Sequence, residues 1–150
     1  MNDLALQRLT AAGWTPDRRV DYSSIENAYA KAGMTIPDKL KSFFSSFAFI
    51  HIEYDIQHIE QESHYFDPSF DFHNYNKADY MHLFDDYGIN GMAYPVGSAY
   101  RGNMTIYYHD NGHFYLYMEC SSLIQTGDTV ESLLNGLIGN DDHDWVNIDD

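Results

Sequence analysis

Residues 104–119, with the sequence MTIYYHDNGHFYLYME, contain the strongest local signal for the fold. Two β-prone runs flank Asn111-Gly112, which is the favoured pair for a two-residue type I′ turn. The stretch therefore predicts a β-hairpin. In the register that such a turn imposes, Tyr108 lies opposite Tyr115, and the tyrosines of the hairpin point to both faces of the sheet.

The segments around the hairpin predict one α+β domain that spans residues 1–150 and ends in an acidic tail at 140–150. Alternation of apolar and polar residues predicts further strands, and apolar residues with helical spacing predict helices. The spacing of Ser23 and Glu26 also indicates a capping box. Residues 55–76 are polar, rich in His and aromatic residues, and fit no clear element. The expected strands are 48–54 and 94–100, and the expected helices are 4–12, 23–32, 37–47, 77–87 and 128–137.

The charge of the chain restricts its partners. Its 23 acidic residues face eight basic ones, so the formal net charge is −15. Such a chain is repelled by nucleic-acid phosphates and by anionic lipid, and it attracts a cationic partner. A simpler interpretation, that the acidity only keeps the protein soluble, stays open. The apolar content of 44 % is enough for one hydrophobic core.

Cys120 is the only cysteine, which excludes an internal disulfide and favours a reducing compartment. No basic-then-apolar leader opens the chain, and no run of 18 apolar residues occurs, so we expect a cytoplasmic protein. We expect the Cys120 thiol to be buried and inert.

Catalytic patterns are missing from the sequence. There is no nucleophile elbow, no phosphate-binding glycine loop and no metal-binding motif of recognised spacing. His58, Glu60, Glu62 and His64 alternate, so that one face of a strand would offer ligands suited to a transition metal. A solvated polar face explains the same four residues. We therefore expect no enzymatic activity, no metal and no cofactor, and keep a His/Glu metal enzyme as an alternative.

Tyrosine is abundant, with 13 residues, and it is enriched at the centres of protein interfaces. In a fold with helices on one side of the sheet, one face of the hairpin stays exposed, and tyrosines beside acidic groups suit a basic protein partner. Packing of all these rings in the core is the alternative. The candidate partner-binding residues are Glu53, Asp55, Glu60, Glu62, Tyr107, Tyr115, Asp141, Asp142, Asp144 and Trp145.

The run at residues 12–21, AGWTPDRRVD, resembles the N-terminal signature of the SUKH-3 group in the SUKH (SMI1/KNR4-like) superfamily. Further pieces follow in the order of that family, among them Pro95-Val96-Gly97 before a strand and Gly127-Asp128 before the last helix. The resemblance extends over residues 9–139, and residues 55–90 fit it least. It implies that Trp14, Arg18 and Gly97 maintain the fold and do not contact a partner.

The resemblance implies N-terminal helices packed on a mixed, mainly antiparallel sheet with a C-terminal helix. It also implies a bacterial immunity protein, which binds and neutralises a cognate domain of a polymorphic or contact-dependent toxin, often a nuclease or a deaminase. The acidity agrees with such a basic partner, since acidic groups compete for the cations that hold phosphate. A regulatory scaffold or adaptor of the SMI1/KNR4 type is the alternative, and the oligomeric state is left open.

Overall fold

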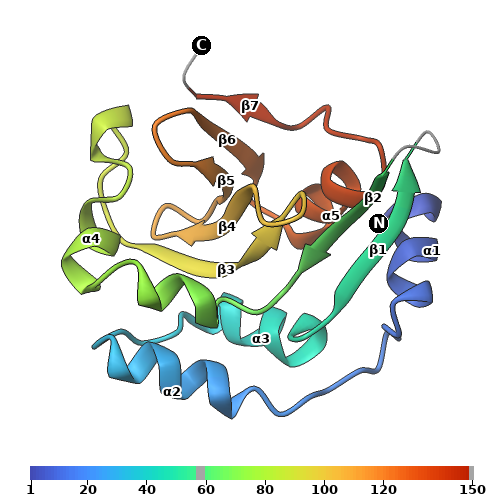
Figure 1. Ribbon diagram of the computed structural model, residues 1–150, viewed down its shortest axis with the longest axis horizontal. Coiled ribbons are helices and arrows are strands. Elements are labelled where there is room, and N and C mark those ends of the chain that lie inside the picture. The colour runs from blue at the N-terminus through green and yellow to red at the C-terminus, as the bar shows by residue number, and fades with distance from the viewer. Residues whose placement is uncertain (57–59, 149–150) are drawn as a thin grey trace.

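The computed structural model describes residues 1–56 and 60–148, which form one seven-stranded sheet with helices on it. The strands follow chain order from β1 at one edge to β7 at the other, and each pairing is antiparallel (Figure 1). This architecture confirms the α+β class and the C-terminal helix. The strands are β1 (His51–Ile56), β2 (Glu60–Tyr65), β3 (Ala93–Ala99), β4 (Met104–His109), β5 (Phe114–Met118), β6 (Ser122–Gly127) and β7 (Val146–Asn147).

Four of the five expected helices are present, with ends that differ by one or two residues, whereas the helix expected over 77–87 is divided into a shorter helix, Lys77–His82, and a separate 3₁₀ helix, Asp85–Tyr87. The capping box does not lie at the expected place, because α2 begins at Ser23 itself and its N-cap, Tyr22, makes no side-chain bond. A capping box forms instead where Asn76 and Asp79 bond reciprocally at the start of α4. The helices are α1 (Asp3–Ala11), α2 (Ser23–Lys31), α3 (Asp38–Phe47), α4 (Lys77–His82) and α5 (Val130–Ile138), with short 3₁₀ helices η1 (Ser69–His73) and η2 (Asp85–Tyr87).

One face of the sheet, called the helix face below, packs against α1, α3 and α5. Figure 1 shows α1 beside β1, and the two elements are in contact. Phe43 of α3 lies edge-on to Phe66, with ring centroids 5.3 Å apart, and reaches Phe114 of β5 at 6.1 Å. The apolar stripe predicted for residues 37–47 is thus the contact between α3 and the sheet.

The AGWTPDRRVD run is tied to the end of α3. The Trp14 ring stacks on Phe47 with centroids 5.4 Å apart, and its Nε1 donates to Ser46 Oγ at 3.0 Å. The Arg18 guanidinium donates to the carbonyl oxygens of Ser46 at 2.6 Å and Ala48 at 2.8 Å. Carbonyls at a helix C-terminus lack partners within the helix and carry partial negative charge, so a cation there stabilises the helix. Trp14 and Arg18 therefore maintain the fold, as expected.

The opposite face of the sheet, called the second face, is covered over β3–β5 by residues 67–92, which we call the cover segment. Phe84 packs against Tyr107, Tyr115 and Tyr117 at centroid distances of 5.8, 5.1 and 5.4 Å. Asp71 is buried, and its Oδ2 accepts hydrogen bonds from the hydroxyls of Tyr80 at 2.9 Å and Tyr107 at 2.8 Å. This segment, in which residues 67–76 fit no sequence pattern, thus forms a third layer.

The hairpin forms, but its predicted turn and register are wrong. Its loop has three residues, 110–112: the His109 N–H donates to His113 O, the Gly112 N–H donates to His109 O, and Gly112 is left-handed with φ 88°. The extra loop residue shifts the pairing, so that Tyr107 lies opposite Tyr115 on the second face. A shift of one residue exchanges the two faces of a strand, which places both rings under the cover segment.

Candidate functional site

The second face has a part that the cover segment leaves uncovered. Cross-strand pairing aligns Tyr65 with Ser98, Ser98 with Thr105 and Thr105 with Tyr117 across β2–β5. Side chains alternate along a strand, so the neighbouring positions of β1 and β2 share this face. The strip is half-buried to exposed throughout. We call it the open strip: His51, Glu53, Asp55, Gln61, Ser63, Tyr65, Ser98, Thr105 and Tyr117.

Two of the expected partner-binding residues lie on the open strip. Glu53 and Asp55 are exposed on β1, opposite Ser63 and Gln61 of β2. His51 Nε2 lies 3.3 Å from Glu53 Oε1, and the His51 ring meets the Tyr65 ring with centroids 5.4 Å apart. Tyr65 is 37 % exposed. An aromatic ring beside carboxylates is thus available to a partner at this edge of the sheet.

A second group of acids and tyrosines, which the sequence did not reveal, borders the strip at Tyr117. The pKa of Tyr117 is raised by burial and then by the nearby Tyr87, Glu119, Cys120 and Asp86. Tyr75 of the cover segment hydrogen-bonds to Glu119, and burial is the main cause that raises the Tyr75 pKa to about 12. These hydroxyls stay protonated at neutral pH and are hydrogen-bond donors beside carboxylates.

Cys120 is exposed, so the expected burial of its thiol is wrong. The residue has φ 59° in the turn between β5 and β6, where the Ser121 N–H donates to Met118 O. It therefore lies in a surface turn and not inside a strand.

Of the four alternating residues His58, Glu60, Glu62 and His64, the two whose side chains are described do not lie on a polar surface. Glu62 and His64 share one face of β2, as expected, but this is the helix face, where they are 7 % and 1 % exposed. Glu62 Oε1 accepts a hydrogen bond from the Ser63 N–H at 3.2 Å. The predicted exposure of Glu62 is therefore wrong, because the helix layer covers it. His58 and the side chain of Glu60 lie outside the described residues.

Both ring nitrogens of His64 already have hydrogen-bond partners. Nδ1 accepts from the Tyr100 N–H at 3.1 Å, which leaves the neutral ring its proton on Nε2, 2.8 Å from the Tyr54 hydroxyl. Burial, and then the Arg8 guanidinium, lower the His64 pKa to about 4. Among the described residues no three His, Cys, Asp or Glu side chains are grouped as metal ligands would be.

Tyr107 and Tyr115 are not on the surface. They are 0 % and 1 % exposed because the cover segment lies over both rings. The expectation that a hairpin face stays exposed is wrong for these two residues, since helices cover the helix face and the cover segment covers the second face. Both rings are part of the hydrophobic core.

The acidic tail is held against the domain as far as residue 148. Trp145 is half-buried and its Nε1 donates to Ser132 O at 3.1 Å, while β7 pairs with β6. Asp142 and Asp144 are exposed, and Asp141 is half-buried. The imidazole of His143 lies between Asp141, which it hydrogen-bonds, and Asp144, whose Oδ1 is 3.1 Å from Nε2. The tail thus places these carboxylates near each other, and Asp142 is close enough to Tyr100 that its charge, after burial, Tyr54 and Glu62, helps to raise the Tyr100 pKa.

Charge is divided unequally between the two parts of the chain. Residues 1–47, which include α1–α3, contain five acidic and six basic residues, whereas residues 48–150 contain 18 acidic and two basic ones. The strip itself has no Lys or Arg among its members. The negative potential of the protein therefore arises from the part of the chain that forms the sheet, the cover segment and the tail.

The comparison with protein families gives one match. The model of the SUKH-3 immunity protein family matches residues 1–140. The chain belongs to this family. No curated protein and no solved structure matches it. Membership in a SUKH-3 immunity protein family supports a role as a bacterial immunity protein, and it implies a cognate toxin as the partner.

Gly97, which the family resemblance groups with Trp14 and Arg18, also has a structural role in this SUKH-3 chain. A Cβ added to Gly97 would lie 2.3 Å from the carbonyl oxygen of Tyr65 and 2.9 Å from Cα of Phe66. Only glycine lets β3 approach the end of β2 this closely.

In the described part of the chain, no helix has the length and apolar character needed to cross a bilayer.

Proposed function

We propose that this SUKH-3 chain neutralises a cognate toxin domain whose active-site cleft is basic, and that it does so by blockade and not by catalysis. The toxin classes that have such clefts are those that bind nucleic acid or its bases, namely nucleases and deaminases. The observation that carries the proposal is the charge division: the whole excess of acidic residues belongs to residues 48–150, the part of the chain that forms the sheet and its uncovered strip.

The open strip supports this role through its chemistry. Glu53 and Asp55 offer carboxylates to Lys and Arg side chains, which would otherwise bind phosphate. Tyr65 and Tyr117 add ring surface at low entropic cost, and tyrosine faces also attract guanidinium groups. The strip lies on paired strands, so its side chains are held by the sheet before the partner arrives.

Co-expression with the toxin domain encoded immediately upstream tests the proposal. Growth is expected to be rescued, and the two proteins are expected to elute together in size-exclusion chromatography. Absence of both results would contradict the proposal. A pull-down that returns only endogenous housekeeping proteins would favour the scaffold alternative instead.

A further inference from the structure

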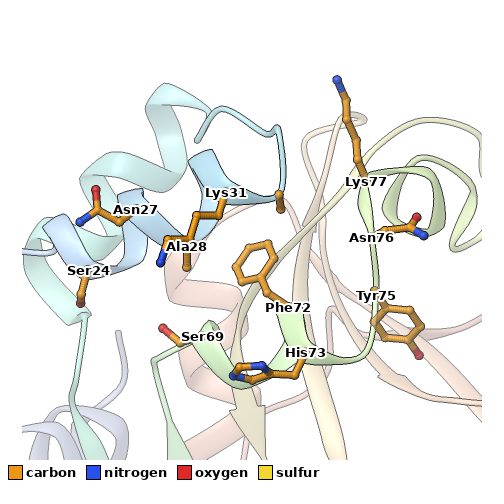
Figure 2. Close-up of a pocket in the computed structure, with 11 residues that line it drawn as sticks. Ser24, Asn27, Ala28, Lys31, Ser69, Phe72, His73, Tyr75, Asn76 and Lys77 are labelled. Carbon is orange, nitrogen blue, oxygen red and sulfur yellow. The ribbon is translucent and has the colours of Figure 1, made fainter.

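A second concave site lies beside the cover segment, and its lining residue Tyr75 also belongs to the group that borders the open strip at Tyr117. It is a groove of about 880 Å³ between α2 on one side and the segment from η1 to the start of α4 on the other (Figure 2). We call it the α2 groove. Its lining residues are Ser24, Asn27, Ala28, Lys31, Ala32, Ser69, Phe72, His73, Tyr75, Asn76 and Lys77.

The lining of the α2 groove contains no acidic residue, although the chain as a whole has 23. Lys31 comes from α2 and Lys77 from α4, so the two walls each supply an exposed ammonium group. No carboxylate of the described residues pairs with either of them. Two carboxylates behind the lining are already engaged, since Asp79 is bonded to Asn76 and Glu119 to Tyr75. The ammonium groups of Lys31 and Lys77 have no such partner in the described part of the chain, and salt at about 0.15 M screens the acids that lie more than about 8 Å from them.

The floor of the groove is apolar and fixed. Phe72 is half-buried in the middle of the site in Figure 2, and its ring lies edge-on to Tyr29 at 5.0 Å and to Tyr80 at 5.5 Å. Ala28 and Ala32 have small side chains, which leave room above α2. A ligand with an apolar portion can therefore lie on this floor while its charged groups meet the lysines.

The remaining polar side chains favour a peptide as the ligand. Ser24, Asn27 and Lys31 are spaced so that they lie along one face of α2. From Ser24 to Lys31 this face is about 10 Å long, which is the length of about three residues of an extended chain. The Asn27 amide can both donate and accept, as the backbone of an extended peptide requires. The Asn76 amide oxygen already accepts the Asp79 N–H, so Asn76 offers its NH₂ group as a donor. A nucleic acid is disfavoured, because its continuous row of phosphates would extend into the negative field of the other residues.

We propose that the α2 groove is a second docking site of this protein, and that it binds an extended acidic peptide segment of a protein partner. The carboxylates of the segment pair with Lys31 and Lys77, its backbone bonds to the amide side chains, and an apolar residue contacts Phe72. This site differs in charge from the open strip, and no residue of the strip lines it, so it does not depend on the proposed function.

Blocked hexapeptides of glycine and serine that carry three aspartates, no charge or three lysines are suitable probes. Each is titrated into the isotopically labelled full chain, and amide chemical shifts are followed by NMR. The aspartate peptide is expected to bind with a sub-millimolar Kd and to shift amides of residues 24–32 and 69–77. The neutral and lysine peptides are expected to leave these amides unchanged.

A pair of charge-matched variants isolates the two lysines. The variant with Lys31→Glu and Lys77→Glu is expected to weaken binding of the aspartate peptide at least tenfold. The variant with Arg19→Glu and Lys41→Glu, which changes the net charge equally but lies outside the groove, is expected to change the Kd less than threefold. Thermal unfolding of both variants checks that the fold is intact.

Three results would overturn this proposal. The first is the absence of binding of the aspartate peptide at millimolar concentration. The second is equal binding to the two charge-reversal variants. The third is binding of a thymidine hexanucleotide as tight as that of the peptide with the same amide shifts, which would assign the groove to phosphate. None of these results depends on a toxin, so they separate this proposal from the proposed function.

Discussion

The hydroxyl of Tyr107 in β4 donates a hydrogen bond to the Asp71 carboxylate in the cover segment, over 2.8 Å and across 36 residues of sequence. Tyr80 donates to the same oxygen. Burial raises the Asp71 pKa, and the two hydroxyl bonds partly counteract that effect. This cluster is the polar connection between the sheet and the layer that covers its second face.

Replacing Asp71 tests how much this connection stabilises the fold. Asp71→Ala leaves two buried hydroxyls without their acceptor, so we expect a loss of about 2–4 kcal/mol in the free energy of unfolding measured with urea. Asp71→Asn is the matched control, because its amide oxygen still accepts both bonds, and it is expected to cost less than about 1.5 kcal/mol. Equal losses for the two variants would contradict the role of the acceptor.

Gly97 is expected to be the glycine that tolerates substitution least. In Gly97→Ala the new Cβ meets backbone atoms of Tyr65 and Phe66, which have no flexible side chain to move away. We expect a loss of about 2–4 kcal/mol, at the upper end of the effects of overpacking. Gly102→Ala is the control, since a Cβ there meets open space, and its φ of 83° alone costs about 1 kcal/mol. If both variants had the same thermal midpoint, the close approach of β3 to the end of β2 would not be the cause of the stability loss in Gly97→Ala.

His64 is expected to make the stability depend on pH. Its pKa is about 4 in the folded protein and 6.5 in the unfolded chain, so the unfolded state binds more protons between these values. The free energy of unfolding should thus fall as the pH is lowered from 6.5 to about 4, by up to roughly 3 kcal/mol from this residue. In His64→Asn, which keeps an acceptor for the Tyr100 N–H, this component should be absent. A His64 imidazole signal that titrates near pH 6.5 in NMR would contradict the prediction.

Charge reversal on the open strip is expected to slow association with the toxin. The variant with Glu53→Lys and Asp55→Lys should reduce the association rate constant at least tenfold at low salt, because electrostatic attraction acts mainly on encounter. The control with Asp17→Lys and Glu26→Lys has the same net charge and lies in residues 1–47, so its effect should stay below threefold. An association rate that does not change with salt or with either variant would mean that the acidity is incidental.

Tyr117 and Tyr115 are expected to differ in their effect on binding. Tyr117 is half-buried at the border of the strip, whereas Tyr115 is covered by Phe84. Tyr117→Ala should raise the dissociation rate of the toxin complex with a small loss of stability. Tyr115→Ala should destabilise the fold by about 3–5 kcal/mol, as other truncations of buried aromatic residues do. If Tyr115→Ala raised the dissociation rate and Tyr117→Ala destabilised the fold instead, the contact surface would lie elsewhere.

The family and most elements could be predicted from the sequence because their signals are local. The apolar spacing in residues 37–47 defines α3, and the AGWTPDRRVD run fits a helix end that needs a stacked indole and a guanidinium. The acidity of the chain is likewise a property of composition. These features need no knowledge of which residues meet across the fold.

The location of the candidate surface depended on the tertiary structure. The sequence predicted a two-residue turn, and one additional loop residue moved Tyr107 and Tyr115 to the same face, where residues 67–92 cover them. Residues 67–76 of this segment fit no sequence pattern because Asp71 is held by a long-range contact with Tyr107, which no local pattern reveals.

The sequence by itself thus determined the class, the family and the sign of the charge. Only the tertiary structure decided that Glu53 and Asp55 are exposed while Glu62 and the hairpin tyrosines are buried. The physical reason is that exposure depends on what packs over a strand, and here the covering layer on the second face ends before it reaches β1 and β2.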